Sequence, residues 1–527
     1  MKVKQVFFLF LILFLAVSPS AVAQVQPPPD LDAYVERVMK TFEVPGLCVA
    51  VVKDGGVVVA KGYGVRKLGE PAPVDAQTLF GIASNTKVVT ATALGLLVEE
   101  GKLQWDAPVI RYLPWFQMWD PYVTRELTVR DLLVHRSGLG LGAGDLLWWP
   151  PSTYNRKEIA RRLRFIPPVT SFRNAYAYDN VLYLVAGEVI EALSGLTWED
   201  FVRTRILQKV GMNTSTVTLS GAAGANVATT HAPVDGKVRP VKPFESENTN
   251  PAGGINSNAE DMAKWMLVQL GRGKLADGTR LFSEATAQQL TTLVTPITIR
   301  APDPVFGELR PNFQGYALGF AVKDYRGRKM VLHAGGLPGY VSRVLMIPEA
   351  QIGITVLTNQ ESTGAMDAIA YHIADYYLGA SDKDWLEVQL KARARAEAEL
   401  AEAMKKAAAA RDTTSRPSLP LASYAGTYED GWYGEVSIVL ESGRLVMRFV
   451  HTPALVGDLE HWQHDTFVVR WRDRELRADA YVTFALQPDG SIDQVKMQPA
   501  SPDVDFSFDF QDLLLRPVKR PAAGERK

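Results

Sequence analysis

The feature that most constrains the fold is the separation of the strand-forming runs into an early pair and a late group. The stretch "GLCVAVVKDGGVVVAKGYG", which begins at Gly46, is typical of two strands joined by a turn at residues 54–56. Strand-like runs return only after residue 313, and the region between about residues 84 and 290 is mostly helical in pattern. We therefore expect one sheet built from both ends of this region, with the helical part inserted between them.

A change of composition predicts a second unit in the last part of the chain. Residues 383–411 are rich in Ala, Glu, Lys, Arg and Leu and lack Gly and Pro, which favours a long exposed helix of about 40 Å. Beyond Pro417 and Pro420, alternating patterns with turns at residues 442–443 and 489–490 continue to "FSFDFQDLLLRPV" and predict a small antiparallel barrel. The expected divisions are a signal peptide at 1–23, a first domain at 24–380, a charged helical linker at 381–418 and a barrel at 419–527.

The linker helix is too long and too polar to belong to a compact core. We expect it to hold the barrel away from the main domain, or to dock it against a cleft of its own or a neighbouring subunit. The barrel would then affect access to that cleft rather than the chemistry inside it.

The N-terminus has the three-part layout of a secretory signal. Two lysines precede an apolar run from Val6 to Val17, and small residues precede Gln24. The run is shorter than the roughly 20 residues that a spanning helix needs, so we expect cleavage and no stable membrane anchor, with an uncleaved anchor as the alternative. Cys48 is the only cysteine and predicts a buried thiol without an internal disulfide. Together these features favour a periplasmic or secreted bacterial protein.

Charge and histidine placement argue against several classes of function. Lys and Arg number 57 against 58 Asp and Glu, and no basic stripe accompanies them, which argues against nucleic-acid binding. The seven histidines are scattered, and His461 and His464 lack the spacing of a zinc protease helix, so we expect neither a metal nor a cofactor. A small-molecule or peptide substrate is the expected partner, and a homo-oligomer is compatible with the sequence.

A serine and a lysine three residues apart form the first chemical motif. In "FGIASNTKVVTAT", Ser84 and Lys87 stand where a helical pattern begins, so they share one helix face. A buried amine with a lowered pKa can take the serine proton and create a nucleophile. Taken alone, the pair is more often a serine cap followed by a surface lysine.

Two further motifs follow along the chain. Tyr178 and Asn180 flank an aspartate in "NAYAYDN", where a phenol and a carboxamide can face one cleft. His333 stands two residues before Gly335 in "LHAGGLPGY", and glycines there allow a substrate backbone to come close. Each motif by itself is also compatible with ordinary packing, capping or a strand-end turn.

In this order the three motifs resemble those of the serine penicillin-recognising enzymes, specifically the class C β-lactamase-related serine hydrolases. The phrases "LLVHRSGLG" and "PAGGINSNAEDMAKWM" are also typical of that family, and the resemblance covers about residues 30–380. The tail is similar to the lipocalin-like domain that accompanies some of these enzymes. The resemblance implies an α/β (α+β) β-lactamase/transpeptidase-like fold, in which an antiparallel five-stranded sheet is flanked by helices and joined to an all-helical lobe.

The resemblance also implies a covalent acyl-enzyme mechanism on peptide, amide or ester substrates. Ser84 would be the nucleophile, and Lys87 and Tyr178 would shuttle protons, with the general base left open between them. Asn180 would orient the substrate amide. The backbone N–H groups of Ser84 and Gly336 would hold the oxyanion.

His333 departs from the family, because the β-lactamases and carboxypeptidases of this fold usually carry lysine there. A neutral histidine gives no lasting charge for a substrate carboxylate, so we expect recognition to relax and β-lactam turnover to be weak. His333 could also help Tyr178 relay protons. The alternatives are a β-lactamase, a D-alanyl-D-alanine carboxypeptidase, or a non-catalytic penicillin-binding sensor.

Overall fold

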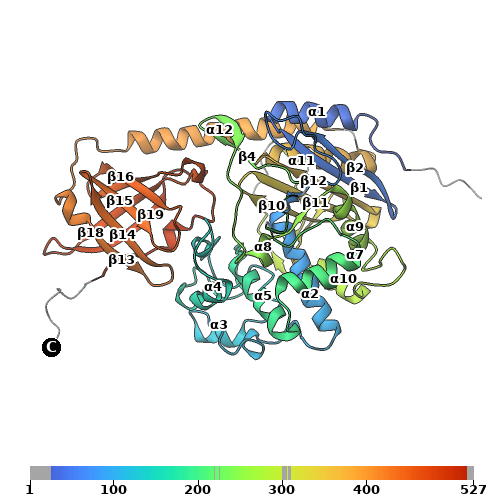
Figure 1. Ribbon diagram of the computed structural model, residues 1–527, viewed down its shortest axis with the longest axis horizontal. Helices are drawn as coiled ribbons and strands as arrows, with labels where there is room; N and C mark the ends of the chain where they lie inside the picture. Colours follow the sequence, from blue (N-terminus) through green and yellow to red (C-terminus); the bar gives the residue numbers. More distant parts are fainter. Residues whose placement is uncertain are drawn as a thin grey trace, which may run out of the picture.

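The computed structural model describes residues 25–218, 220–222, 224, 226–299, 305–306, 310–380 and 382–518 (Figure 1). The predicted signal peptide at 1–23 lies outside these residues. A large α/β body and a smaller β-barrel lie side by side, and the long helix α12 (Trp385–Ala409) spans the two along one side of the molecule.

The central sheet unites both ends of the first domain, as the sequence predicts, and has the strand order β2-β1-β12-β11-β10-β9-β8-β7. It has eight strands rather than the five expected, because three short strands extend it beyond β10. β9 pairs with β10 only as far as Leu332, so the end of β10 from His333 to Leu337 has no partner from β9. The strands are β1 (Gly46–Lys53), β2 (Gly56–Gly64), β7 (Thr295–Pro296), β8 (Gln314–Tyr316), β9 (Ala321–Tyr325), β10 (Arg328–Leu337), β11 (Tyr340–Ile347) and β12 (Ile352–Thr358).

Helices cover both faces of this sheet, and β1 shows why. Leu47, Val49 and Val51 pack with α1 (Leu31–Phe42) and α11 (Thr363–Leu378) on one face. Their neighbours along β1, which include the buried Cys48, point into the larger core on the other face. A strand with apolar side chains on both sides must be covered on both.

The inserted region forms the helical part, and α2 begins beside the sheet and runs away from it (Figure 1). Two minor sheets pair β3 (Phe80–Gly81) with β6 (Asn256–Ser257) and β4 (His231–Val234) with β5 (Lys237–Pro240). The α-helices of the inserted region are α2 (Thr86–Glu99), α3 (Pro121–Glu126), α4 (Arg156–Arg162), α5 (Val181–Ser194), α6 (Trp198–Val202), α7 (Gln208–Val210), α8 (Asn250–Gly253), α9 (Ala259–Leu270) and α10 (Glu284–Thr291).

No single helix in the described part of the chain is long and apolar enough to cross a membrane. The segments Val181–Ser194 and Trp198–Val210 together have the length and apolar composition of a membrane span, but the chain bends by 75° between them. Most of α5 is buried within the core of the first domain.

The mostly helical pattern expected between residues 84 and 290 does not hold for "TVRDLLVH", where residues 129–135 form consecutive turns. The Asp131 carboxylate accepts hydrogen bonds from the N–H and the hydroxyl of Thr128 and forms salt bridges with Arg136 and Arg173. His135 ends the segment with a left-handed φ of 56°. These local hydrogen bonds compete with the helical ones and decide the outcome.

The C-terminal unit is a nearly closed antiparallel barrel, as predicted. Its sheet has the order β19-β18-β17-β16-β15-β14-β13-β20, and a bridge between Val495 and Leu515 brings its ends together. The strands are β13 (Gly426–Asp430), β14 (Gly434–Glu441), β15 (Arg444–Phe449), β16 (Val456–Gln463), β17 (Thr466–Trp471), β18 (Ala480–Leu486), β19 (Ile492–Pro499) and β20 (Arg516–Pro517).

Two details of this half differ from the sequence prediction. The linker helix is not exposed throughout, since Trp385 and Leu386 at its start are buried, and the Trp385 ring stacks on Tyr371 of α11. The alternating stretch from Phe506 is largely irregular, with one turn, a short 3₁₀ helix and only the two-residue strand β20 at its end. That segment leaves the barrel wall and packs against the first domain.

Candidate active site

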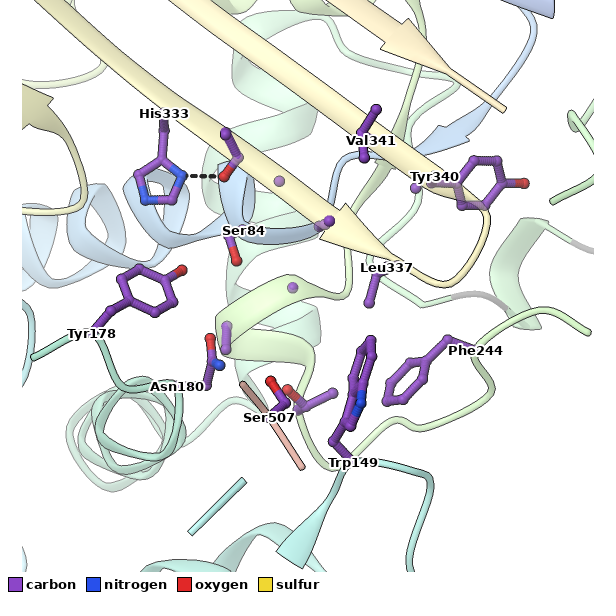
Figure 2. A pocket seen from close by; sticks show the side chains of 18 of the residues that line it. Ser84, Trp149, Tyr178, Asn180, Phe244, His333, Leu337, Tyr340, Val341 and Ser507 are labelled. Atoms are coloured by element: carbon purple, nitrogen blue, oxygen red, sulfur yellow. Dashed lines mark hydrogen bonds between the residues drawn. The ribbon is translucent and has the colours of Figure 1, made fainter. Parts of the chain in front are cut away.

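Ser84 lies in a single 3₁₀ turn, Ala83–Asn85, between the short strand β3 and helix α2. Ala83 has a left-handed φ of 49°, an unfavourable conformation for a residue with a Cβ and one that clusters at functional sites. Ser342 of β11 holds the turn: its hydroxyl donates to Ile82 O at 2.7 Å and accepts from the Asn85 amide at 2.8 Å. These bonds hold the turn so that the Ser84 hydroxyl lies at the wall of the cavity (Figure 2).

Lys87 lies one turn along α2 and is fully buried. Its Nζ is 3.0 Å from Ser84 Oγ, 2.7 Å from Asn180 Oδ1 and 3.1 Å from Ala252 O. The amide and carbonyl oxygens can only accept, so they occupy two N–H bonds. In a neutral amine the lone pair is then directed at the Ser84 hydroxyl.

Burial lowers the pKa of Lys87 to about 7, although the nearby Asp145 and Asp179 act in the opposite direction. Burial likewise raises the pKa of Asp145 to about 7 and that of Asp179 to about 8. The amine is therefore poised to hold or release a proton near neutral pH, as a general base requires. No group of three or more His, Cys, Asp or Glu side chains among the described residues is arranged to hold a metal ion.

Tyr178 faces Ser84 from the loop before α5, and Figure 2 shows the two hydroxyls directed toward the same space. Lys87 Nζ lies 4.9 Å from the centroid of the Tyr178 ring. Burial raises the pKa of Tyr178 well above its ordinary value, against a lowering contribution from Ser84. The side chain is a phenol in the free protein, so it can donate a proton but does not serve as a phenolate base.

Asn180 joins Lys87 to a carboxylate that the sequence analysis did not single out. Its Oδ1 accepts from Lys87, and its Nδ2 donates to Asp145 Oδ2 at 2.8 Å. We expected Asn180 to orient the substrate amide, and the structure also gives it a role in holding Lys87. Asp145 follows an ordinary glycine-rich loop, and no motif signal in the sequence points to it.

His333 lies on β10, and its ring is held by two hydrogen bonds. Nδ1 donates to Ala334 O at 2.5 Å, so Nε2 accepts from the Tyr316 hydroxyl at 2.7 Å. Burial and the neighbouring Lys87 lower the pKa of His333 to about 3, which keeps the ring neutral. The ring centroids of His333 and Tyr178 are 6.3 Å apart. Because the Tyr316 hydroxyl donates to His333 Nε2, this nitrogen is not free to exchange a proton with Tyr178.

The two glycines of this motif have different surroundings. A Cβ on Gly335 would lie 2.3 Å from Ile82 O, so this glycine lets the protein's own turn before Ser84 approach β10, and it also lines the cavity. Gly336 has open space beside it and belongs to the edge of β10 that β9 leaves free. A substrate can therefore come close to Gly336.

The cavity around these residues has a volume of about 480 Å³ and is more apolar than polar. One wall is aromatic, with Trp149 and Phe244 stacked at a ring distance of 4.9 Å (Figure 2). Arg343 is the only cation among the described lining residues, and both its Nε and Nη2 are bonded to Asp367. The cavity offers a large apolar surface and no unpaired cation there.

The barrel docks against this cleft within the same chain, one of the two arrangements that we expected. The ring centroids of Phe506 and Tyr178 are 6.0 Å apart in an edge-to-face contact, and both Phe506 and Ser507 line the cavity. Sequence reasoning missed both residues because the phenylalanine alternation of their segment is typical of a strand.

Two family models match this chain. Residues 31–378 match the family model described as Beta-lactamase, and residues 410–517 match a domain of unknown function, DUF3471. The chain belongs to the beta-lactamase family. The unguisins hydrolase ungD' of Aspergillus campestris is 30% identical over 502 residues, which cover 88% of each chain. Penicillin-binding protein 4 of Amycolatopsis lactamdurans is 28% identical over 60% of this chain and 81% of its own. This member of the family is a serine hydrolase.

Two solved structures of similar fold cover more than nine-tenths of this chain. The octameric penicillin-binding protein homologue from Pyrococcus abyssi has a TM-score of 0.59 at 22% identity and covers 92% of this chain and 99% of its own. SurE has a TM-score of 0.53 at 20% identity over 93% of this chain and 98% of its own. The β-lactamase-like fold with a C-terminal barrel is therefore confirmed.

Proposed function

We propose that this serine hydrolase acts through a covalent acyl-enzyme on Ser84, with Lys87 as the base that activates it. The proposal rests on the geometry of Lys87. Two fixed acceptors take the N–H bonds of the neutral amine, so its lone pair faces Ser84 Oγ at 3.0 Å. The phenolic state of Tyr178 supports Lys87 over Tyr178 as the base in the free enzyme.

In the proposed first half-reaction, the Ser84 proton passes to Lys87 Nζ as Oγ bonds to the substrate carbonyl carbon. The leaving nitrogen or oxygen then takes a proton from the Tyr178 hydroxyl, and the Lys87 ammonium replaces that proton. Water reverses these transfers and releases the acyl group. The N–H groups of Ser84 and Gly336 would hold the oxyanion, a role supported by the free edge of β10.

We propose neutral peptides, amides or esters with a bulky apolar acyl group as substrates. The neutral His333 ring and the pairing of Arg343 with Asp367 support a site without a dedicated carboxylate partner. The aromatic wall of Trp149 and Phe244 supports apolar side chains. One relative is named as an unguisins hydrolase, and a structure of the same fold is titled SurE with D-Leu, so both D- and L-residues belong in the substrate panel.

We also propose that the protein is exported and forms a homo-oligomer. The layout of residues 1–23 supports a cleaved signal peptide and a mature protein in the periplasm or outside the cell. The octameric state named for the Pyrococcus abyssi homologue supports a homo-oligomer, which size-exclusion chromatography with light scattering would test.

Acylation of Ser84 is the direct test of the proposed function. A fluorophosphonate or a slow ester is expected to add one acyl or phosphonyl group to the full-length protein, as measured by intact-mass spectrometry. Ser84→Ala is expected to show no adduct, and Ser501→Ala, at the barrel surface, serves as a control that keeps it. An adduct that persists in Ser84→Ala, or its absence in the wild-type protein, would overturn the proposal.

The pH dependence of turnover gives an independent check. Because Lys87 must be neutral to accept the serine proton and burial lowers its pKa to about 7, kcat/KM is expected to rise between about pH 6 and pH 8. His333, with a pKa of about 3, does not titrate in this range, whereas Asp145 and Asp179 do, and their ionisation favours the Lys87 ammonium. Asn180→Asp places an acceptor of negative charge beside the amine and is expected to move the midpoint to higher pH. A rate that falls over this interval would contradict the assignment of Lys87 as the base.

A further inference from the structure

The segment between β19 and β20, residues 505–512, leaves the barrel wall and lies against the loop at residues 138–149 of the helical region. We call it the docking segment. The approach is close: a Cβ on Gly142 would lie 2.7 Å from Phe506 O, so only glycine fits at this point of the loop. Phe508 and Phe510 anchor the segment in the apolar core.

Asp509 of the docking segment binds the backbone beside Asp145. Its carboxylate is fully buried and accepts the N–H groups of Gly144 at 2.6 Å and Leu146 at 3.0 Å. These groups belong to the start of the 3₁₀ turn Asp145–Leu147, which has no side-chain cap of its own. The barrel thus fixes the backbone that carries Asp145.

Ser507 binds the Asp145 side chain directly. Its hydroxyl donates to Asp145 Oδ2 at 2.9 Å, and the same oxygen accepts from Asn180 Nδ2 at 2.8 Å. The other oxygen accepts from Trp148 Nε1 at 2.9 Å. Of the three side-chain donors that hold this buried carboxylate, one comes from the barrel.

A held Asp145 decides which way the Asn180 amide points. Because Nδ2 donates to Asp145, Oδ1 faces Lys87 and accepts its N–H. A flipped amide would present two N–H bonds to Lys87 and take up the lone pair that should receive the serine proton. We propose that Ser507 and Asp509 are positioning residues, through which the barrel completes the active site of its own chain. This inference rests on the proposed function of Lys87.

Contacts on either side of the docking segment fix the barrel to the same chain. Arg477 of the barrel pairs with Glu361 at 2.7 and 2.8 Å, next to the sheet. On the other side the Tyr154 hydroxyl donates to Tyr433 O, and Arg162 donates to Trp432 O at 2.9 Å. The docking segment therefore reaches the cleft from a barrel that is anchored at both ends of the contact.

The proposal is tested in the full-length chain with Ser507→Ala, which removes the hydroxyl, and Ser507→Thr, which keeps it. The acylation rate of Ser84 is expected to fall about tenfold in Ser507→Ala, the range for a lost hydrogen bond to a charged group, and to recover in Ser507→Thr. Ser501→Ala, whose hydroxyl bonds only Asp503 at the barrel surface, is the matched control. Asp509→Asn keeps the side-chain shape and is expected to act in the same direction as Ser507→Ala.

A second measurement does not depend on catalysis. The titration of Lys87 can be followed by ¹³Cε NMR in lysine-labelled protein and assigned with Lys87→Arg. Ser507 helps to keep Asp145 ionised, and Asp145, together with Asp179, favours the Lys87 ammonium over the amine. Ser507→Ala is therefore expected to move the Lys87 midpoint to lower pH, while Ser507→Thr and Ser501→Ala leave it in place.

The outcomes separate this inference from the proposed function. An unmodified Ser84 in the wild-type protein would contradict the proposed function, and the NMR titration would still test the coupling. An acylation rate and a Lys87 midpoint that are unchanged in a folded Ser507→Ala protein would overturn the positioning role of the barrel.

Discussion

Replacing Lys87 by alanine is expected to lower kcat about 100-fold or more, because proton transfer from Ser84 loses its base. Tyr178 also faces Ser84, but burial keeps it a phenol, so it does not replace Lys87 as the acceptor of this proton. Single-turnover kinetics with a neutral ester would separate a slow acylation step from weaker binding. We expect KM to change much less than kcat.

Tyr178→Phe is the companion change and is expected to reduce kcat by a similar factor of about 100, through loss of the proton donated to the leaving group. The effect should be smaller for an ester with a good leaving group than for an amide, because such a group needs less protonation. Lys391→Ala, on the exposed face of α12, is the control for general effects of lysine removal. Turnover close to that of the wild type in both Lys87→Ala and Tyr178→Phe would remove the roles assigned to them.

His333→Lys is expected to raise kcat/KM for a cephalosporin relative to a neutral ester by about tenfold or more. The added ammonium supplies a charge-assisted partner for a substrate carboxylate, worth about 1.5–3 kcal/mol. Ester turnover should fall at the same time, because the change removes the acceptor that His333 Nε2 provides to Tyr316. The new lysine also lies near Lys87 in a buried site, and both features disfavour its ammonium form. We therefore expect the effect of its charge mainly when an anionic substrate is bound.

The matched control is His372→Lys, on helix α11 at the outer face of the sheet, where His372 pairs with Asp30 at 3.2 Å. It is expected to leave the ratio of the two substrates unchanged. A wild-type preference for the cephalosporin of about tenfold or more at pH 7 would instead identify a β-lactamase. Equal ratios in wild type and His333→Lys would show that the charge at this position does not select the substrate.

The sequence by itself predicted the parts of the site that are local. Ser84 and Lys87 are three residues apart at the start of a helix, so their contact follows from helix geometry wherever the helix lies. Tyr178 and Asn180 flank one residue at the start of α5, and the structure places both beside Lys87. The two-sided apolar pattern of β1 likewise required helices on both faces of the sheet.

The tertiary structure alone decided which distant groups surround those motifs. Ser507 and Asp509 lie more than 360 positions from the Asp145 turn that they hold, and no periodicity links such residues. The stretch from Phe506 has the alternation of a strand, yet several of its backbone N–H groups bond to carbonyls of the same segment, and Asp509 binds the facing loop, instead of pairing with a neighbouring strand. Local pattern reports which side chains must be buried, whereas the partner that buries them depends on how the two domains pack.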